Sequence, residues 1–440
     1  MSDGVSSRRV AFLAGAAIVL LTTYIYWPAV WFYFLHDDFQ WLEGAMVFRP
    51  SQLWQLSDRQ HFYRPAIELY FALMHQGARC QAAAFHLASL AVHVTNALIV
   101  LAIGTRLGTP VAGLLGAIGF AALPAYAEAV VWPSAVTELL STTAGLVAIW
   151  VDLRRTQAPG RVKDVVVPVA LGTALACHES AATILPTMIL LRWAKQSEPL
   201  AARALVKSYA PSSAVLVVFL LVTAVVNSRN YVITEGHYRA GPHVLWNLLD
   251  ALVTLYVGHR TMLEYAAVLL VVAVAVWKGD ALTRALVGWL LLALAPALPF
   301  AWGVSSRYLY MPAVPFSLLL ARGLVALTAR AEVAMAPPAI APSWRRRAAL
   351  VIPCGVALVL VGRFAGFAHK TVLNFRPHFA APEQVAADVR ARARGIPPVV
   401  TISADRLEQV DSRIVGALAR VALCRPDVDV RIVTDPSSGP

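Results

Sequence analysis

Two adjacent aspartates, Asp37 and Asp38, follow directly after an apolar segment near the start of the chain. As a structural feature, the pair would cap the next helix, because Asp is favoured at the N-cap and in the first turn. As a catalytic feature, it would supply a general base. Two close carboxylates, or one that is partly desolvated, have a raised pKa and can take a proton from an attacking hydroxyl. The residues alone leave both interpretations open.

Basic residues suited to binding a phosphate occur at two later positions. Arg64 follows Tyr63 and precedes a proline, and Arg307 follows two serines; each borders an apolar stretch. A guanidinium is planar and always charged, so it can hold a phosphate through two parallel N–H groups. The alternative is an anchoring role, in which the arginine extends to the headgroups of a bilayer. We retain Arg64, Tyr63 and Arg307 as candidate residues for binding a lipid phosphate.

Three further ionisable residues interrupt apolar sequence. Glu128 has apolar neighbours on both sides, and His178 and Glu179 stand together between two apolar runs. Ionisable residues in such places are expensive in lipid and usually line water or a functional site. A structural Glu–Arg pair is the competing interpretation for Glu128. All three are candidate substrate-binding residues.

The composition of the chain is that of a membrane protein. Of 440 residues, 58% are hydrophobic and only 14% are charged, and the mean hydropathy is +0.63. Soluble domains carry roughly 25% charged residues, so this chain has more apolar surface than one aqueous core can bury. The net charge of +12 comes from short basic clusters between apolar runs. Such clusters are typical of topology signals and do not indicate a nucleic-acid-binding face.

The apolar runs predict an all-α polytopic fold with eleven membrane-spanning helices, give or take two. A helix needs roughly 20 apolar residues to cross a bilayer. The first run is too long for a signal peptide and is expected to be a retained span. The expected spans are residues 10–34, 84–104, 110–126, 135–152, 164–177, 180–193, 209–227, 262–277, 284–301, 308–328 and 349–368.

The placement of basic residues predicts the topology. With Arg8 and Arg9 in the cytoplasm, the strong basic clusters, ending with Arg345–Arg347, all fall on the cytoplasmic side, as the positive-inside rule requires. The opposite side receives residues 35–83, 127–134, the turn near His178, 228–261, 302–307 and the tail from His369. All candidate site residues therefore face one extracytoplasmic compartment.

The composition changes near the end of the membrane part. We expect a transmembrane domain over residues 1–369, whose outer loop 35–83 carries the aspartate pair, and a small extracytoplasmic α/β domain over residues 370–440. In this tail, Pro397–Ser403 and Val428–Val433 are predicted strands, and Ser412–Leu423 is a predicted helix. So short a segment buries little core, so its intrinsic stability should be low.

The four cysteines show no metal-binding spacing. Cys80, Cys177, Cys354 and Cys424 are scattered through the chain, with no CxxC pair. We expect them to be small buried residues and expect no disulfide framework. No ligand cluster with metal spacing is visible either, so no cofactor is firmly implied, and dependence on a divalent metal stays open.

Several short motifs, in order, resemble a known group of enzymes. An outer-loop Asp-Asp after the first span resembles the GT-C superfamily of polyprenyl-phosphate-sugar-dependent glycosyltransferases. Four further segments resemble the membrane half of the transmembrane-and-TPR O-mannosyltransferases and their bacterial relatives. They are Tyr63-Arg64-Pro65, Phe85-His86-Leu87 with His93-Val94-Thr95-Asn96-Ala97, Phe120 to Trp132 through Pro124 and Glu128, and Arg307-Tyr308-Leu309-Tyr310. The similarity runs from about residue 30 to 325.

The resemblance implies a GT-C-like fold, in which the first outer loop covers a cavity. It implies a polyprenyl-phosphate-linked sugar donor, net inversion at the anomeric carbon, Asp38 or Asp37 as the base, and Arg307 with Arg64 on the lipid phosphate. It also suggests a bacterial inner membrane, with the site facing the periplasm. Two departures stand out: no TPR repeats follow the spans, and His178 replaces a lysine in the group's Lys-Glu-Ser motif.

Two other functions fit a polytopic membrane protein. A secondary transporter also carries intramembrane His, Glu and Arg, but commonly shows paired halves that are absent from this sequence. A non-catalytic scaffold in envelope assembly would need no converging acids and arginines. A glycosyltransferase is therefore the favoured interpretation; its sugar is undetermined, and its acceptor is a protein, a lipid or a glycan.

Overall fold

The computed structural model describes residues 2–56, 62–155, 161–196, 202–334, 343–394, 398–403 and 411–433. His61 lies outside these ranges, as do residues 335–342. The side chains of Arg345–Arg347 and Cys354 are likewise outside the described part, although their helix is described.

The long helices form a bundle. They are α1 (Ser2–Tyr26), α4 (Ala82–Leu107), α5 (Pro110–Ala122), α7 (Val136–Arg155), α8 (Arg161–Cys177), α9 (Ile184–Lys195), α10 (Ala202–Asn227), α12 (His243–Leu255), α13 (Met262–Lys278), α14 (Ala281–Leu294), α15 (Ala313–Ala334) and α16 (Ser343–Asn374). Each of the spans expected from the sequence overlaps one of these helices.

Shorter elements connect the bundle helices and build one end of the molecule. They are the α-helices α2 (Asp37–Met46), α3 (Pro65–Ala78), α6 (Ala127–Val131), α11 (Tyr231–Thr234), α17 (Arg376–Arg392) and α19 (Val415–Leu423), and the strands β1 (Val399–Ser403) and β2 (Asp429–Val433). The 3-10 turns are η1 (Trp27–Trp31), η2 (Pro50–Trp54), η3 (Pro124–Tyr126), η4 (Pro133–Ala135), η5 (Glu179–Thr183), η6 (Ala295–Ala297), η7 (Ser306–Leu309) and η8 (Ser412–Ile414).

Helices long and apolar enough to cross a bilayer identify an integral membrane protein. Within the described residues there are five, or six if α5 and the segment Pro124–Val131, bent by 45°, form one broken span. Residues 164–177, 243–255 and 281–297 form shorter apolar helices. The expected eleven spans are therefore not confirmed. Length and composition do not identify a membrane span when the helix is shorter than the thickness of the bilayer.

Close packing of α4 and α5 depends on two glycines. A Cβ added to Gly104 would lie 2.8 Å from the Cα of Gly113, nearer than real Cβ atoms come to backbone. Small residues let two helix backbones approach in this way, as is common where helices pack in membranes. α5 begins at a proline, and the hydroxyl of its N-cap Thr109 accepts from the backbone N–H of Ala112.

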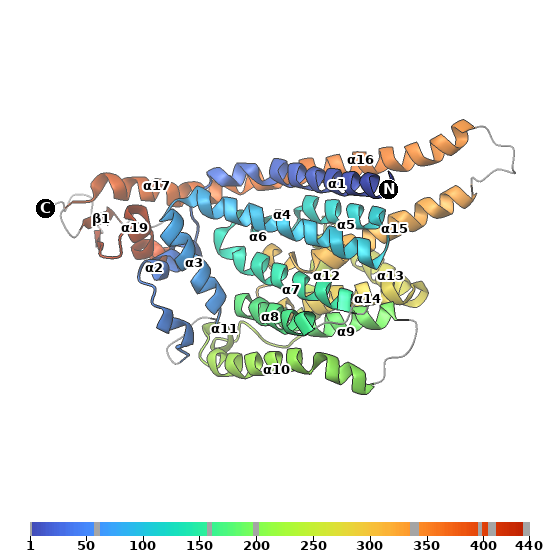
Figure 1. The fold of residues 1–440 in the computed structure, drawn as a ribbon. Helices are drawn as coiled ribbons and strands as arrows, with labels where there is room; N and C mark the ends of the chain where they lie inside the picture. The colour runs from blue at the N-terminus through green and yellow to red at the C-terminus, as the bar shows by residue number, and fades with distance from the viewer. Residues whose placement is uncertain are drawn as a thin grey trace.

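The outer-loop helices and the C-terminal elements gather at one end of the molecule. Figure 1 shows α2, α3, α17, α19 and β1 at this end, with the N-terminus near the other end of the bundle. Strands β1 and β2 pair in parallel, with Val399 opposite Asp429. They and α19 lie where the sequence placed strands and a helix.

The C-terminal segment shares a hydrophobic core with the first outer loop. Phe39 of α2 and Phe71 of α3 belong to the same buried cluster as Val385 of α17 and Leu418 of α19. Polar contacts reinforce this packing: Arg420 of α19 forms an ion pair with Glu43 of α2. The C-terminal segment is thereby held as a cap on the outer loop.

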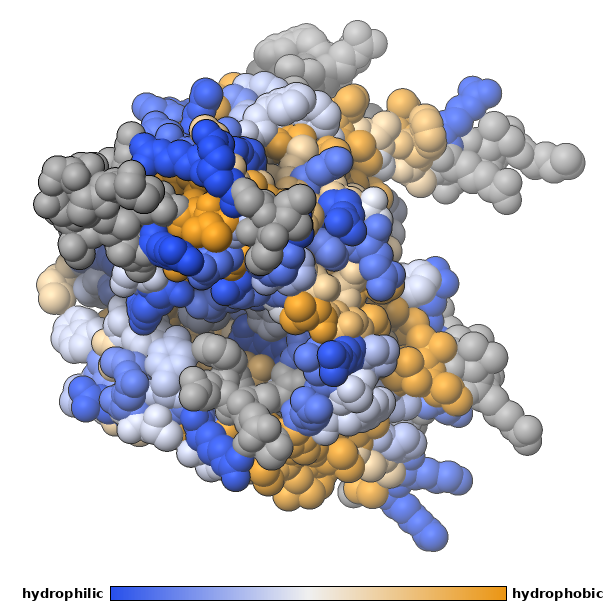
Figure 2. All heavy atoms as spheres, turned by 90° about the vertical axis from the view of Figure 1, so that its left-hand side faces the viewer, coloured by the Kyte–Doolittle hydropathy of each residue, from blue (hydrophilic) through white to orange (hydrophobic). Residues whose placement is uncertain are grey.

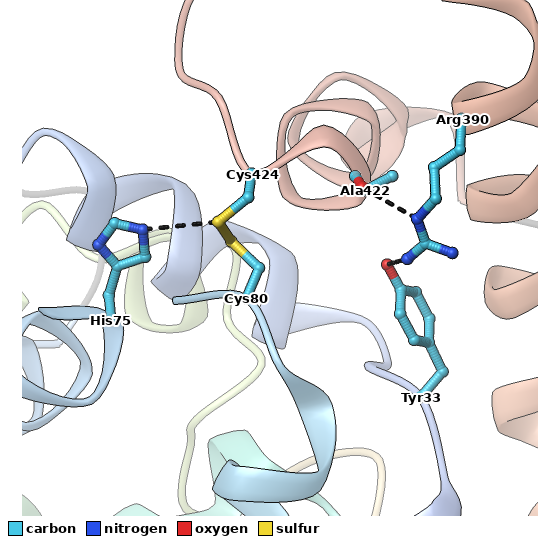
Figure 3. The surroundings of a disulfide bond; sticks show 6 residues. All are labelled: Tyr33, His75, Cys80, Arg390, Ala422 and Cys424. Atoms are coloured by element: carbon cyan, nitrogen blue, oxygen red, sulfur yellow. Dashed lines mark hydrogen bonds between the residues drawn. A yellow bond between two sulfur atoms is a disulfide. The ribbon is translucent and has the colours of Figure 1, made fainter. Parts of the chain in front are cut away.

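A disulfide joins the cap to the outer loop, contrary to the expectation from sequence. Cys80 and Cys424 are bonded, with their Cα atoms 5.7 Å apart, although 344 residues separate them in the chain. Figure 3 shows that Arg390 lies nearby, donating to the hydroxyl of Tyr33 at 3.1 Å and to the carbonyl of Ala422 at 3.0 Å. Only tertiary packing brings such distant cysteines together, so spacing gave no signal. Cys177 is free and buried, as expected.

Candidate active site

Asp38 is buried at the start of α2 and is fully engaged in hydrogen bonds. One carboxylate oxygen accepts from the backbone N–H of Leu35 at 2.8 Å. The other accepts from the backbone N–H of Ser134 at 2.7 Å and from the Ser134 hydroxyl. Burial raises the pKa of Asp38 to about 8, although these hydrogen bonds favour the ionised form. Asp38 therefore connects the start of α2 to η4 through hydrogen bonds.

Asp37, the neighbouring residue, is exposed to solvent. Among the described residues, none hydrogen-bonds to its side chain. The preceding residue, His36, has a φ of 44°, which is unusual for a residue other than glycine. Strained backbone of this kind costs of order 1–3 kcal/mol and clusters at functional sites. The turn thus presents one aspartate to solvent and buries the other.

Glu128 and Arg307 form a partly buried ion pair. A terminal guanidinium nitrogen of Arg307, Nη1, donates to Glu128 at 2.9 Å. The hydroxyls of Ser305 and Ser306 also donate to Glu128, at 2.8 and 2.7 Å. This network fixes Glu128 as the partner that orients Arg307, whose side chain remains 27% exposed.

Trp132 connects this ion pair to the aspartate loop. Its indole N–H donates to the carbonyl of Leu35 at 3.1 Å, and the Arg307 guanidinium lies over its ring, 4.7 Å from the centroid. Trp132 therefore contacts both Arg307 and Leu35, and Leu35 lies two residues before Asp37 in the chain.

Arg64, Glu179 and His178 form a second cluster. Arg64 donates to both carboxylate oxygens of Glu179, at 3.1 and 2.7 Å. A terminal nitrogen of Arg64, Nη2, also lies 3.0 Å from Nε2 of His178. Burial acts to raise the pKa of Glu179, but the charge and hydrogen bonds of Arg64 outweigh it and lower that pKa to about 2. Tyr63, predicted beside them, instead donates to the carbonyl of Leu53 at 2.9 Å.

The second cluster borders a cavity whose lining includes one acid that the sequence analysis did not single out. The cavity has a volume of about 120 Å³ and is lined by His178, Glu179, Tyr308 and the buried Glu138, among others. Glu138 belongs to α7 and lies with its Oε1 3.0 Å from Nε2 of His178. A charged residue inside a predicted span was the available signal for Glu138.

The end of the molecule that carries the aspartate loop is largely hydrophilic. Figure 2 shows this face, with hydrophilic side chains over much of it and a hollow near its centre. Among the described residues, the one group of three potential metal ligands is His75, Cys80 and Cys424. Its two sulfurs are joined to each other in the disulfide.

Comparison with known proteins finds similarity at the level of structure. No family model and no curated protein sequence matches the chain. The crystal structure of ArnT from Cupriavidus metallidurans, bound to undecaprenyl phosphate, matches with a TM-score of 0.54 and 13% identity, over 98% of this chain and 86% of that one. The oligosaccharyltransferase AglB from Archaeoglobus fulgidus, in complex with an inhibitory peptide and a dolichol-phosphate, matches with a TM-score of 0.56 and 11% identity, over 98% and 65%.

These matches establish the fold. Across almost its whole length, the chain shares the fold of the ArnT and AglB structures. This agrees with the GT-C-like fold that the resemblance of its motifs implied.

Proposed function

We propose that the protein is a glycosyltransferase that moves a sugar from a polyprenyl-phosphate donor to an acceptor on the extracytoplasmic face, with inversion. One observation carries the proposal: Trp132 donates a hydrogen bond to Leu35, two residues before the exposed carboxylate of Asp37, and its ring lies under the partly exposed guanidinium of Arg307. The structures of ArnT and AglB, which contain undecaprenyl phosphate and dolichol-phosphate, support a lipid-linked donor.

Asp37 is the proposed general base. The acceptor hydroxyl attacks the anomeric carbon as the bond from that carbon to the phosphate oxygen breaks. Asp37 takes the hydroxyl proton, and the polyprenyl phosphate departs with the bonding electrons. A single displacement of this kind inverts the anomeric carbon. Asp38 suits the role of base less well, because it is buried and its oxygens already accept hydrogen bonds. Its proposed role is to position Asp37.

Arg307 is the proposed binding residue for the departing phosphate. Glu128 holds one terminal nitrogen, and within the described part of the chain the other makes only a long contact of 3.4 Å to Tyr308. The departing phosphate gains negative charge as the glycosidic bond breaks, so a fixed guanidinium stabilises the transition state more than the ground state. Arg64 fits this role less well, because Glu179 already engages its guanidinium at two nitrogens. Its proposed role is to hold the wall of the cavity.

The proposed location of the site is the periplasmic face of a bacterial inner membrane. The disulfide between Cys80 and Cys424 supports an extracytoplasmic position for both the outer loop and the cap. Disulfides form and persist in oxidising compartments such as the bacterial periplasm. The positive-inside pattern of the basic clusters points in the same direction.

Two substitutions at Arg307 test this function. Purified protein in lipid is given polyprenyl-phosphate-linked sugars, and release of polyprenyl phosphate is measured. Lysine keeps the charge but loses the planar geometry, so Arg307→Lys should be impaired about tenfold or more, and Arg307→Ala further. If Arg307 is only a membrane anchor, lysine serves equally well. Wild-type turnover in both variants would exclude Arg307 from the site and remove the main support for the function.

A further inference from the structure

The lining of the cavity beside Arg307 has two chemically different parts. One is polar and includes Glu138, His178 and Glu179. The other is largely aromatic and includes Phe300 and Tyr308, whose rings stack with their centroids 5.3 Å apart and an interplanar angle of 7°. Small polar ligands with an apolar face, sugars above all, match such a combination. Hydroxyl groups donate to carboxylates, and ring C–H groups pack on aromatic faces.

Among the described residues, an arginine pairs with only one of the two carboxylates in the polar part of the lining. Arg64 balances Glu179 through their two-pronged ion pair. The backbone N–H of Ser180 points at Nδ1 of His178 at 3.2 Å, and Arg64 approaches Nε2 of the same ring at 3.0 Å. No arginine or lysine among the described residues forms an ion pair with Glu138, which lies 3.0 Å from His178.

Glu138 is also short of hydrogen bonds. Its exposed fraction is 3%, and among the described residues its Oε1 accepts no hydrogen bond of ordinary geometry, despite lying 3.0 Å from Nε2 of His178. A buried charged oxygen without a donor is costly, so such groups are normally satisfied. A ligand hydroxyl entering the cavity would supply the missing donor.

We infer that this cavity binds the sugar of the lipid-linked donor and selects sugars that carry no anionic group. The inference rests on the proposed function, since Arg307 must hold the phosphate for the attached sugar to reach Glu138. Tyr308 connects the two places, because its ring lies beneath the Arg307 guanidinium, at 5.0 Å, and lines the cavity. A uronic acid would bring its carboxylate against Glu138 and be repelled.

Matched donors test the selection. Binding to purified full-length protein in nanodiscs is measured for bare polyprenyl phosphate and for carriers bearing glucose, glucuronic acid, mannose or mannuronic acid. Within each pair, the sugars differ only in having a hydroxymethyl or a carboxylate group. Wild-type protein should bind the neutral member about tenfold or more tightly. Glu138→Gln, which removes one charge at nearly constant shape, should reduce this preference to about threefold or less.

The same helix offers a control. Asp152, near the other end of α7, is also buried and accepts from the Tyr209 hydroxyl at 2.7 Å. Asp152→Asn removes one charge far from the cavity and should keep the wild-type preference. If Glu138→Gln fails to fold, the wild-type preference alone decides.

The outcomes separate the two proposals. Equal binding of neutral and anionic sugars by the wild type would overturn the inference, as would an unchanged preference in a folded Glu138→Gln variant. In both cases, binding of bare polyprenyl phosphate that is lost in Arg307→Ala would leave the proposed function standing. Absence of binding to every carrier, the bare one included, would overturn both.

Discussion

Substitution of the two adjacent aspartates by asparagine should give opposite results. Asp37→Asn removes the proposed base from an exposed position, so it should lower transfer about a hundredfold or more and leave the free energy of unfolding within about 0.5 kcal/mol of wild type. Asp38→Asn instead damages the structure. Its amide oxygen can still accept from Ser134, but its NH₂ group then faces the backbone N–H of Leu35. One hydrogen bond is lost and a buried donor is left unpaired, a penalty of roughly 1–3 kcal/mol.

Thermal unfolding and transfer measured on the same purified preparations separate the two effects. The Asp38→Asn variant should unfold several degrees below the wild-type temperature, whereas the Asp37→Asn variant should unfold at the wild-type temperature. The serine that contacts Asp38 provides a matched control, because Ser134→Ala removes one hydrogen bond from Asp38 and should reproduce part of its loss of stability. Wild-type turnover in Asp37→Asn, or wild-type stability in Asp38→Asn, would refute this division of roles.

Two further predictions concern the cap and the topology. Removing the disulfide with Cys80→Ser should lower the free energy of unfolding by about 2–4 kcal/mol, measured by thermal unfolding. Adding reductant to the wild-type protein should have the same effect. If neither the substitution nor the reductant lowers stability, the cap is not disulfide-bonded. Reporter fusions at residue 60 and at the C-terminus should both report the outer compartment, and a cytoplasmic tail would reverse the topology.

The sequence predicted the helices and the gathering of the site better than the individual roles. Apolar runs and basic clusters are properties of whole segments, and they suffice to put Asp37, Glu128, His178 and Arg307 at the same end of a helix bundle. Asp37 and Asp38 differ in burial because their side chains point in different directions. Successive helix residues point about 100° apart, and which one faces the interior is decided by Ser134, almost a hundred residues away.

The remaining features depend on contacts between distant segments. Arg64 resembled a phosphate-binding residue, but its guanidinium is bound by Glu179, which is 115 residues away in the chain. Cys80 and Cys424 meet only because the cap packs on the outer loop. Glu138 could have been noticed as a charge within the expected span 135–152. Its place in a cavity, however, depends on His178 and on the aromatic side chains that also line the cavity. A single sequence contains none of these pairings explicitly.

The most direct test of the account is an experimental structure of the protein with a polyprenyl phosphate bound. Phosphate oxygens should lie about 3 Å from the guanidinium of Arg307. The phosphate oxygen that carries the sugar in the donor should point toward Asp37 and the cavity. Phosphate held instead by Arg64, with its pair to Glu179 broken, or lipid density elsewhere with Arg307 still closed on Glu128, would contradict it.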